Sequence, residues 1–264
     1  MIVDVHAHFY TEACGRADWE RLNRRRIDVG DRIGITYHVA SILGSWGRTS
    51  PTYMSSREDI SQANTGMVRL THAMPHRVRA YCVVNPNFPD HAEAEVERGF
   101  AAGMIGIKLA ASRRANDELL DAVVLAAARH QAPILHHIWQ RRRRDWPGQE
   151  ASDAVELVGL ARRHPSTPLI LAHIGGGGDW AHSLRAVRPV PNVFVDLSGS
   201  GVDSGMLESA IDAVGVERML WGTDVTLDTG LAKLRSLGTI LSDAELERVS
   251  GGNARAIFPP GAFE

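Results

Sequence analysis

The sequence predicts a single-domain α/β protein, a (β/α)8 or TIM barrel that spans residues 1–264. Short runs rich in Val and Ile alternate with longer segments of helical composition, which is typical of repeated βα units. Eight such runs occur, each followed by room for a helix. A chain of roughly 250 residues is also the usual size of this barrel. A doubly wound open sheet has the same alternation, so the pattern favours the barrel without excluding the sheet.

The expected strands are short and apolar and follow one another at regular intervals. They cover residues 2–5, 37–42, 78–84, 104–108, 133–137, 169–173, 193–196 and 219–221. Three expected helices stand out by apolar residues at three- and four-residue spacing, over residues 92–102, 117–130 and 153–164. The longest connections follow the first two strands, so we expect them at the carboxyl face, where barrel enzymes build their sites.

Composition and charge are those of an ordinary globular protein. Hydrophobic residues make up 44% of the chain and charged residues 23%, with a formal net charge of −2. This balance gives no electrostatic reason to expect nucleic acid or a membrane as a partner. No apolar run approaches the roughly 20 residues that span a bilayer. Two cysteines and no visible signal peptide suit a reducing compartment, so we expect a cytoplasmic protein acting on a small molecule. Homo-oligomer formation is left open.

The segment that ends in His6-Ala7-His8 carries the strongest chemical signal. Side chains alternate along a strand, so His6 and His8 point the same way, ~6.5 Å apart. Two converging imidazoles at the end of a first barrel strand can bind one divalent cation. The motif alone is weak, because two half-exposed histidines near a terminus would have the same spacing.

Several other expected strands end in the same way. Lys108 closes the fourth strand, His136 and His137 the fifth, His173 the sixth, and Asp224 follows the eighth. Burying several unpaired polar groups would cost about 1–3 kcal/mol each, so packing alone does not explain this set. Alternation lets only one of the adjacent histidines face the barrel interior, and we expect His137 because it is nearer the loop.

Taken in order and spacing, these residues resemble the amidohydrolase superfamily, in particular its amidohydrolase-2 group of barrel hydrolases and decarboxylases. The resemblance covers nearly the whole chain. It runs through His6, His8, Lys108, His137, the His173-Ile-Gly-Gly segment, Thr223-Asp224 and Gly252-Asn253-Ala254.

The resemblance implies a role for each of these groups. His6, His8 and His137 would bind the metal, and His173 would either bind a second metal or polarise the substrate carbonyl. Asp224 would contact the metal and act as general base, then return the proton to the leaving group. The expected cofactor is one or two divalent ions, zinc before manganese, since such a metal lowers the pKa of bound water towards ~7.

Lys108 bears on the number of metals. In several binuclear members of the superfamily, a lysine of the fourth strand is carboxylated and bridges two cations. This requires a neutral amine, which burial near cations makes accessible by lowering the pKa. A charged lysine that binds a substrate carboxylate, or an interior ion pair, is the alternative.

Residues just beyond two strands are candidates for substrate recognition. Trp139 and Gln140 follow His137 directly, and Trp46 and Arg48 follow the second strand. We expect the remaining histidines, among them His38, to be structural or surface residues.

These observations predict a metal-dependent hydrolase that uses metal-activated water on an amide, lactone or ester bond of a small molecule, which can carry a carboxylate. A metal-dependent non-oxidative decarboxylase of the same superfamily is the alternative, although the chain looks short for that branch. A non-catalytic protein that binds a metal or small molecule is the alternative of another class. Asp224 argues against it, because a binder needs no base beside the metal.

Overall fold

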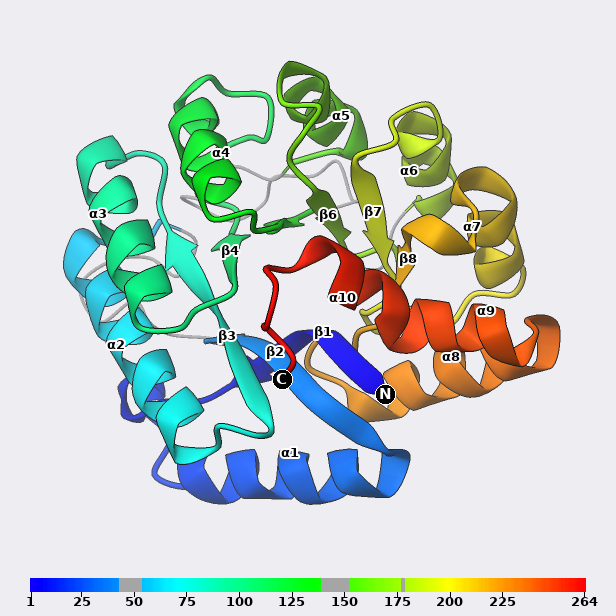
Figure 1. Cartoon of the computed structure of the whole chain (residues 1–264), viewed down its shortest axis with the longest axis horizontal. Coiled ribbons are helices and arrows are strands. Elements are labelled where there is room, and N and C mark those ends of the chain that lie inside the picture. Colours follow the sequence, from blue (N-terminus) through cyan, green and yellow to red (C-terminus); the bar gives the residue numbers. More distant parts are fainter. Residues whose placement is uncertain (43–53, 139–151, 177–178) are drawn as a thin grey trace.

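The computed structural model describes residues 1–42, 54–138, 152–176 and 179–264, and it has the predicted (β/α)8 architecture (Figure 1). Eight parallel strands lie in chain order around the barrel. They are β1 (Ile2–Phe9), β2 (Ile35–Ile42), β3 (Val78–Val84), β4 (Gly106–Leu109), β5 (Ile134–His137), β6 (Leu169–Ala172), β7 (Val193–Asp196) and β8 (Met219–Leu220).

Contacts between the first and last strands close the barrel. The Val5 N–H donates to the Trp221 carbonyl at 3.1 Å, and Ala7 and Asp224 form a parallel bridge. A doubly wound open sheet would not bring these residues together. The single-domain barrel predicted from the sequence is therefore confirmed.

The main helices form a ring outside the strands (Figure 1). They are α1 (Trp19–Ile33), α2 (Arg57–Ala73), α3 (Pro89–Ala101), α4 (Leu119–Arg129), α5 (Ala154–Arg163), α6 (Trp180–Val187), α7 (Met206–Val214) and α8 (Leu227–Ile240). Shorter helical segments are η1 (Glu12–Cys14), η2 (Val216–Arg218), α9 (Asp243–Glu247), η3 (Arg248–Gly252) and α10 (Asn253–Ile257). None of the described helices is long and apolar enough to span a bilayer.

Local sequence signals explain where several helices begin. The Ser56 side chain accepts a hydrogen bond from the Asp59 N–H and caps α2. Asp153 and Glu156 form a capping box at the start of α5. α3 begins at Pro89, three residues before the predicted start, because proline is favoured in the first turn of a helix.

Strand alternation separates two apolar layers. The barrel interior is filled by a cluster that includes Val3, Val5, Tyr37, Val39, Tyr81, Leu135, Ile170 and Leu220. The outer layer, between strands and helices, includes Ala7, Phe9, Ala40, Ile42, Ile107, Ile134, Ile138 and Val195. Both cysteines, Cys14 and Cys82, are buried and form no disulfide.

An irregularity in β1 decides which of its residues face inward. Asp4 pairs with His38 and Ala7 with Ala40, so β1 has one more residue than β2 between these pairs. The extra residue is a β-bulge, a feature common beside active sites. Because of it, both Val5 and His6 turn towards the interior, whereas Asp4 faces the helices. β1 also extends four residues beyond the predicted end, because it continues to pair with β2 up to Phe9.

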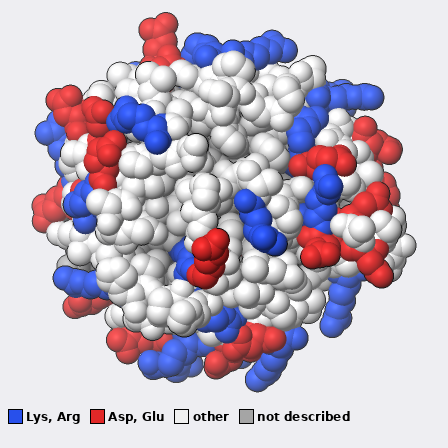
Figure 2. Space-filling model, viewed as in Figure 1, with Lys and Arg blue, Asp and Glu red and all other residues white. Residues whose placement is uncertain are grey.

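The C-terminal segment covers the end of the barrel where the strands begin (Figure 1). Phe258 and Phe263 belong to the interior cluster. Asn253 Nδ2 donates to the carbonyls of Val216 at 2.6 Å and Met219 at 2.8 Å, which ties α10 to β8. On this face, acidic and basic side chains are interspersed, with most of them towards the rim of the view and a few near its centre (Figure 2).

Candidate active site

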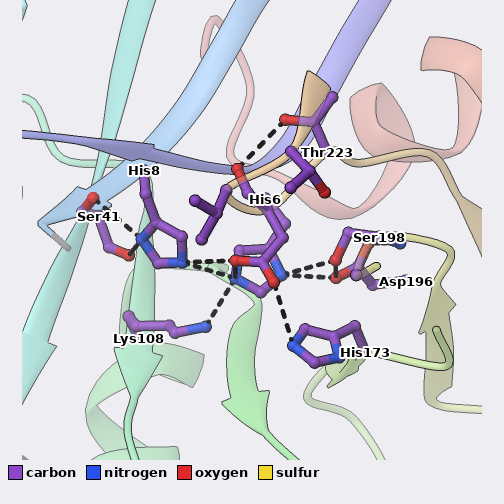
Figure 3. A network of polar contacts seen from close by, with 12 residues as sticks. His6, His8, Ser41, Lys108, His173, Asp196, Ser198 and Thr223 are labelled. Atoms are coloured by element: carbon purple, nitrogen blue, oxygen red, sulfur yellow. Dashed lines mark hydrogen bonds and ion pairs between the residues drawn. The ribbon is translucent and has the colours of Figure 1, made fainter. Parts of the chain in front are cut away.

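Polar side chains from several strands converge at the carboxyl end of the barrel (Figure 3). His6 Nε2 lies 3.2 Å from His8 Nε2. The Oδ1 atom of Asp224 lies 3.1 Å from His8 Nε2 and 4.0 Å from His6 Nε2. One ligand atom of each of these residues therefore falls within 4.8 Å of the others. The structure brings together three of the predicted metal ligands in one compact group.

This group fits a divalent cation in both spacing and tautomer. Donor atoms that bind a metal at about 2.0–2.2 Å lie about 3 Å from one another. His6 Nδ1 lies 2.6 Å from Asp196 Oδ2 and donates to it, which leaves the lone pair of Nε2 facing the group. His8 Nδ1 faces the carbonyl of Ser41 at 3.4 Å and its hydroxyl at 3.2 Å, which likewise leaves Nε2 free to be a ligand.

The protonation states also suit a cation. Burial, reinforced by the charge of Lys108, lowers the pKa of His6 well below its ordinary value of 6.5. Burial would raise the pKa of Asp224, but the contact with His8 Nε2 and the charges that the neighbouring histidines carry when protonated bring it far below its usual range. A neutral His6 imidazole and an ionised Asp224 carboxylate are the states in which these two residues can bind a metal.

Lys108 lies at the same point of the barrel. Its Nζ is 3.1 Å from His6 Nε2, and the residue is buried. Burial lowers the pKa of Lys108 to about 8. Lys108 and Lys233 are the only lysines in the chain, and both are buried.

His173 follows β6 and contacts the other oxygen of Asp224. Its Nε2 lies 3.3 Å from Asp224 Oδ2, so the carboxylate bridges His8 and His173. Burial lowers the pKa of His173, and the charge of Asp224 opposes this shift. A carboxylate and an imidazole at this separation can share one proton.

The adjacent histidines of β5 lie on opposite faces. His137 shares the interior face with Leu135, and its ring packs edge-on to that of His173, with 5.5 Å between centroids. His136 lies on the outer face with Ile134, fully buried, and its Nδ1 is 2.9 Å from the carbonyl of His137. The structure thus places His137, the residue that we expect to be a ligand, beside His173, which contacts Asp224.

The partners that orient His6 are not among the site residues predicted from the sequence. Asp196 is the last residue of β7, so the strand-end argument used for the other strands would have found it. Ser198 follows two residues later, and its hydroxyl donates to Asp196 Oδ2 at 2.6 Å. Burial raises the pKa of Asp196 to about 6.

Four predicted substrate contacts lie outside the described residues. They are Trp46, Arg48, Trp139 and Gln140. Their roles stay predictions.

Comparison with known proteins agrees with this fold from end to end. The 2,6-dihydroxybenzoate decarboxylase from Rhizobium is 18% identical, with 97% of this chain and 98% of that chain covered and a TM-score of 0.76. The 5-carboxyvanillate decarboxylase from Sphingomonas paucimobilis is 17% identical, with 97% of this chain and 98% of that chain covered and a TM-score of 0.74. A dihydroxybenzoic acid decarboxylase from Polaromonas, solved with bound manganese, is 18% identical, with 97% of this chain and 96% of that chain covered and a TM-score of 0.72. A comparison with curated proteins finds no match.

Structural similarity at this level of identity shows a shared fold. The amidohydrolase family model gives the closer assignment, because it matches residues 3–259 of the sequence. The chain therefore belongs to the amidohydrolase family of barrel enzymes, as its sequence motifs indicate.

Proposed function

We propose that this protein is a metal-dependent, non-oxidative decarboxylase of a small aromatic or enoic acid. The main expectation from the sequence was hydrolysis, with decarboxylation as the alternative. The end-to-end similarity to decarboxylases favours the alternative. The chain is not too short for that branch, because it covers 98% of the Rhizobium chain.

The observation that carries the proposal is the pair formed by Asp224 and His173. Non-oxidative decarboxylation replaces a carboxylate on carbon by hydrogen, so the enzyme must deliver one proton to that carbon. Asp224 Oδ2 and His173 Nε2, 3.3 Å apart, can hold this proton between them. Its transfer forms the new C–H bond, the bond to the carboxylate breaks, and the electron pair of that bond returns to the substrate as CO₂ leaves.

The ligand groups are His6 Nε2, His8 Nε2 and an oxygen of Asp224, with His137 as the further candidate. A divalent metal bound there would supply positive charge that orients substrate oxygens and stabilises negative charge. We propose a single ion, because the described residues hold one compact donor group. Manganese, which the Polaromonas structure contains, and zinc are the two candidates.

With a single ion, Lys108 is a cation for the substrate carboxylate and not a metal bridge. Its Nζ lies 3.1 Å from a ligand nitrogen, within reach of an anion bound at the metal. Lys108 and Lys233 are the only lysines, so exposure to ¹³C-labelled bicarbonate gives a simple test by carbon NMR. We expect no carbamate signal. A carbamate signal that disappears in Lys108→Ala, with metal content falling from about two equivalents to one, would instead support the bridge.

Turnover decides the reaction class. We would incubate the manganese- and zinc-loaded protein with 2,6-dihydroxybenzoate and 5-carboxyvanillate in D₂O and follow CO₂ release. The product should carry one deuterium at the carbon that lost the carboxylate. His173→Asn should abolish turnover and retain the metal, because His173 lies beyond the compact donor group.

Two outcomes would contradict this proposal. Cleavage of lactones, esters or amides without release of CO₂ from either acid would support the hydrolase. Binding of small carboxylic acids without turnover, unchanged in Asp224→Asn, would support a non-catalytic protein.

A further inference from the structure

A buried polar cluster lies behind the candidate site, on the outer face of β1. We call Asp4, Arg26, His38 and Thr223 the Asp4 cluster. Asp4, His38 and Thr223 have no exposed surface, and the Arg26 side chain is 10% exposed. The four residues come from β1, α1, β2 and the segment after β8, so the cluster joins elements that are far apart in the sequence.

Asp4 is the centre of this cluster. Its Oδ2 accepts hydrogen bonds from His38 Nδ1 at 2.9 Å and from the Thr223 hydroxyl at 2.7 Å, and Arg26 Nη2 lies 3.3 Å away. Its Oδ1 accepts from the Thr223 N–H at 2.9 Å. Gly30 of α1 leaves room for His38, since a Cβ there would lie 2.7 Å from His38 Nε2. Both oxygens of a buried carboxylate are thus hydrogen-bonded, which makes Asp4 a fixed anchor.

Arg26 connects this anchor to the backbone of Asp224. The Nη2 atom that approaches Asp4 also donates to the Thr223 hydroxyl and, at 2.9 Å, to the carbonyl oxygen of Asp224. On the other side, the Asp224 N–H donates to the carbonyl of His6 at 2.6 Å. Both backbone polar groups of Asp224 are therefore held by neighbouring elements.

The backbone of Asp224 needs this support because its φ is +56°. This left-handed conformation brings the Cβ of a non-glycine residue close to the following carbonyl oxygen and is sterically unfavourable. In it, the carboxylate contacts His8 at 3.1 Å and His173 at 3.3 Å. A return to negative φ would rotate the Cα–Cβ bond and carry the carboxylate away from both histidines.

We propose that Arg26 is a positioning residue for Asp224. Anchored by Asp4, it holds the left-handed backbone that aims the Asp224 carboxylate at His8 and His173. The inference deepens the proposed function, on which it rests for any effect on turnover. Its effects on metal binding and on the backbone need no substrate, so they can be measured even if the reaction proposed above is wrong.

The test compares Arg26→Met with Arg218→Met. Arg218 is a matched control, because it is a partly buried guanidinium that donates to the carbonyls of Val190 at 2.6 Å and Arg188 at 2.9 Å. It precedes β8 and so lies at the opposite end of the barrel. We expect Arg26→Met to weaken Mn²⁺ binding about 10–100-fold, as loss of outer-shell partners does. Arg218→Met should leave Mn²⁺ binding unchanged. Arg26→Lys keeps the charge but loses the planar guanidinium with its several N–H donors. Its Mn²⁺ affinity should therefore lie between those of the wild type and Arg26→Met.

Thr223→Val provides a milder test if Arg26→Met fails to fold. It removes the hydroxyl that joins Arg26 to Asp4, whereas Thr223→Ser keeps it, so only Thr223→Val should weaken Mn²⁺ binding. Equal Mn²⁺ affinity in Thr223→Val and Thr223→Ser, or in Arg26→Met and Arg218→Met, would overturn the inference.

Metal-free crystal structures of the wild type and of Arg26→Met, or of Thr223→Val if Arg26→Met fails to fold, give a readout that does not depend on metal affinity. We expect Asp224 to leave the left-handed region in the variant. If the wild type binds no Mn²⁺, the metal site of the proposed function fails, and these structures alone decide the inference. An unchanged Asp224 conformation would then overturn it.

Discussion

At the scale of single residues, the proposed metal binding depends on which nitrogen of His6 carries the proton. Asp196 accepts from His6 Nδ1 at 2.6 Å and thereby keeps Nε2 available as a ligand. We predict that Asp196→Asn lowers metal affinity about 10–100-fold, because an amide can donate to Nδ1 and favour the wrong tautomer. Competition with a chelating dye measures the affinity. Ser198→Ala removes one hydrogen bond to Asp196 and should have a smaller effect; equal affinity in wild type and Asp196→Asn would refute the tautomer argument.

The same scale shows why only part of the site was predictable. Strand alternation and strand ends identify His8, His173 and Asp224, because they need only the local period of the chain. Arg26 carries no such signal, because it lies within a helix and reaches Asp224 only when β8 closes against β1. The outward direction of Asp4 depends on a bulge defined by pairing with β2, which no single segment encodes.

At the scale of elements, α8 fixes the segment after β7 through one buried ammonium. Lys233 Nζ donates to the carbonyls of Leu197 at 2.8 Å, Ser198 at 3.1 Å and Gly199 at 2.7 Å. We predict that Lys233→Met lowers the free energy of unfolding by about 1.5–3 kcal/mol, the range for hydrogen bonds to a charged group. It should also weaken metal binding, since the segment directly follows Asp196 and contains Ser198, the two partners of His6 Nδ1. Urea denaturation and metal titration together check this; lower stability with full metal affinity would show that the segment keeps its shape without Lys233.

A second link between elements predicts a pH dependence. Glu95 of α3 accepts from Asn64 at 2.8 Å and Ser61 at 2.8 Å on α2, and from Arg98 at 2.7 Å. Burial would raise the pKa of Glu95, but these hydrogen bonds lower it below its ordinary value of 4.5. A carboxylate with a lowered pKa in the folded state stabilises the fold above its unfolded pKa, and the contribution is lost as the pH falls through the folded value.

Glu95→Gln should therefore be less stable than wild type at pH 7, and the difference should narrow as the pH falls below 4.5. Urea denaturation from pH 7 to pH 3 checks the trend. A constant difference across that range would mean that packing, and not ionisation, explains the role of Glu95.

At the scale of the whole molecule, sequence alternation favours the barrel, which the structure confirms, but alternation alone does not exclude an open sheet. Strands and helices follow from the local spacing of apolar residues, so the sequence alone predicts their order. The choice between a barrel and an open sheet depends on contacts such as Asp4 with Thr223, which are 219 residues apart. Asp4 and Thr223 also belong to the cluster that we propose to hold the Asp224 carboxylate, so we expect the site to form only when the barrel is closed.

The two ends of the barrel should therefore respond differently to mutation. Phe258 is 4% exposed and packs at the end opposite to the site, with ring centroids 5.9 Å from Tyr81 and 5.4 Å from Phe263. We predict that Phe258→Ala lowers the free energy of unfolding by about 3–5 kcal/mol, the usual range for loss of a buried aromatic ring. Metal affinity should be unchanged at temperatures where the variant is folded, because residues at this face of the barrel serve stability.

Leu125→Ala is the matched control, since Leu125 is 55% exposed and its truncation should change stability by no more than about 0.5 kcal/mol. Thermal denaturation and Mn²⁺ titration of both variants test the separation. Phe258→Ala could instead weaken Mn²⁺ binding in the folded state as strongly as Arg26→Met is expected to do. The loss of packing around Phe258 would then have to displace His6 and Asp224 at the opposite end of the strands. In that case residues at the end opposite to the site would affect both stability and metal binding, and the two properties could not be assigned to opposite ends of the barrel.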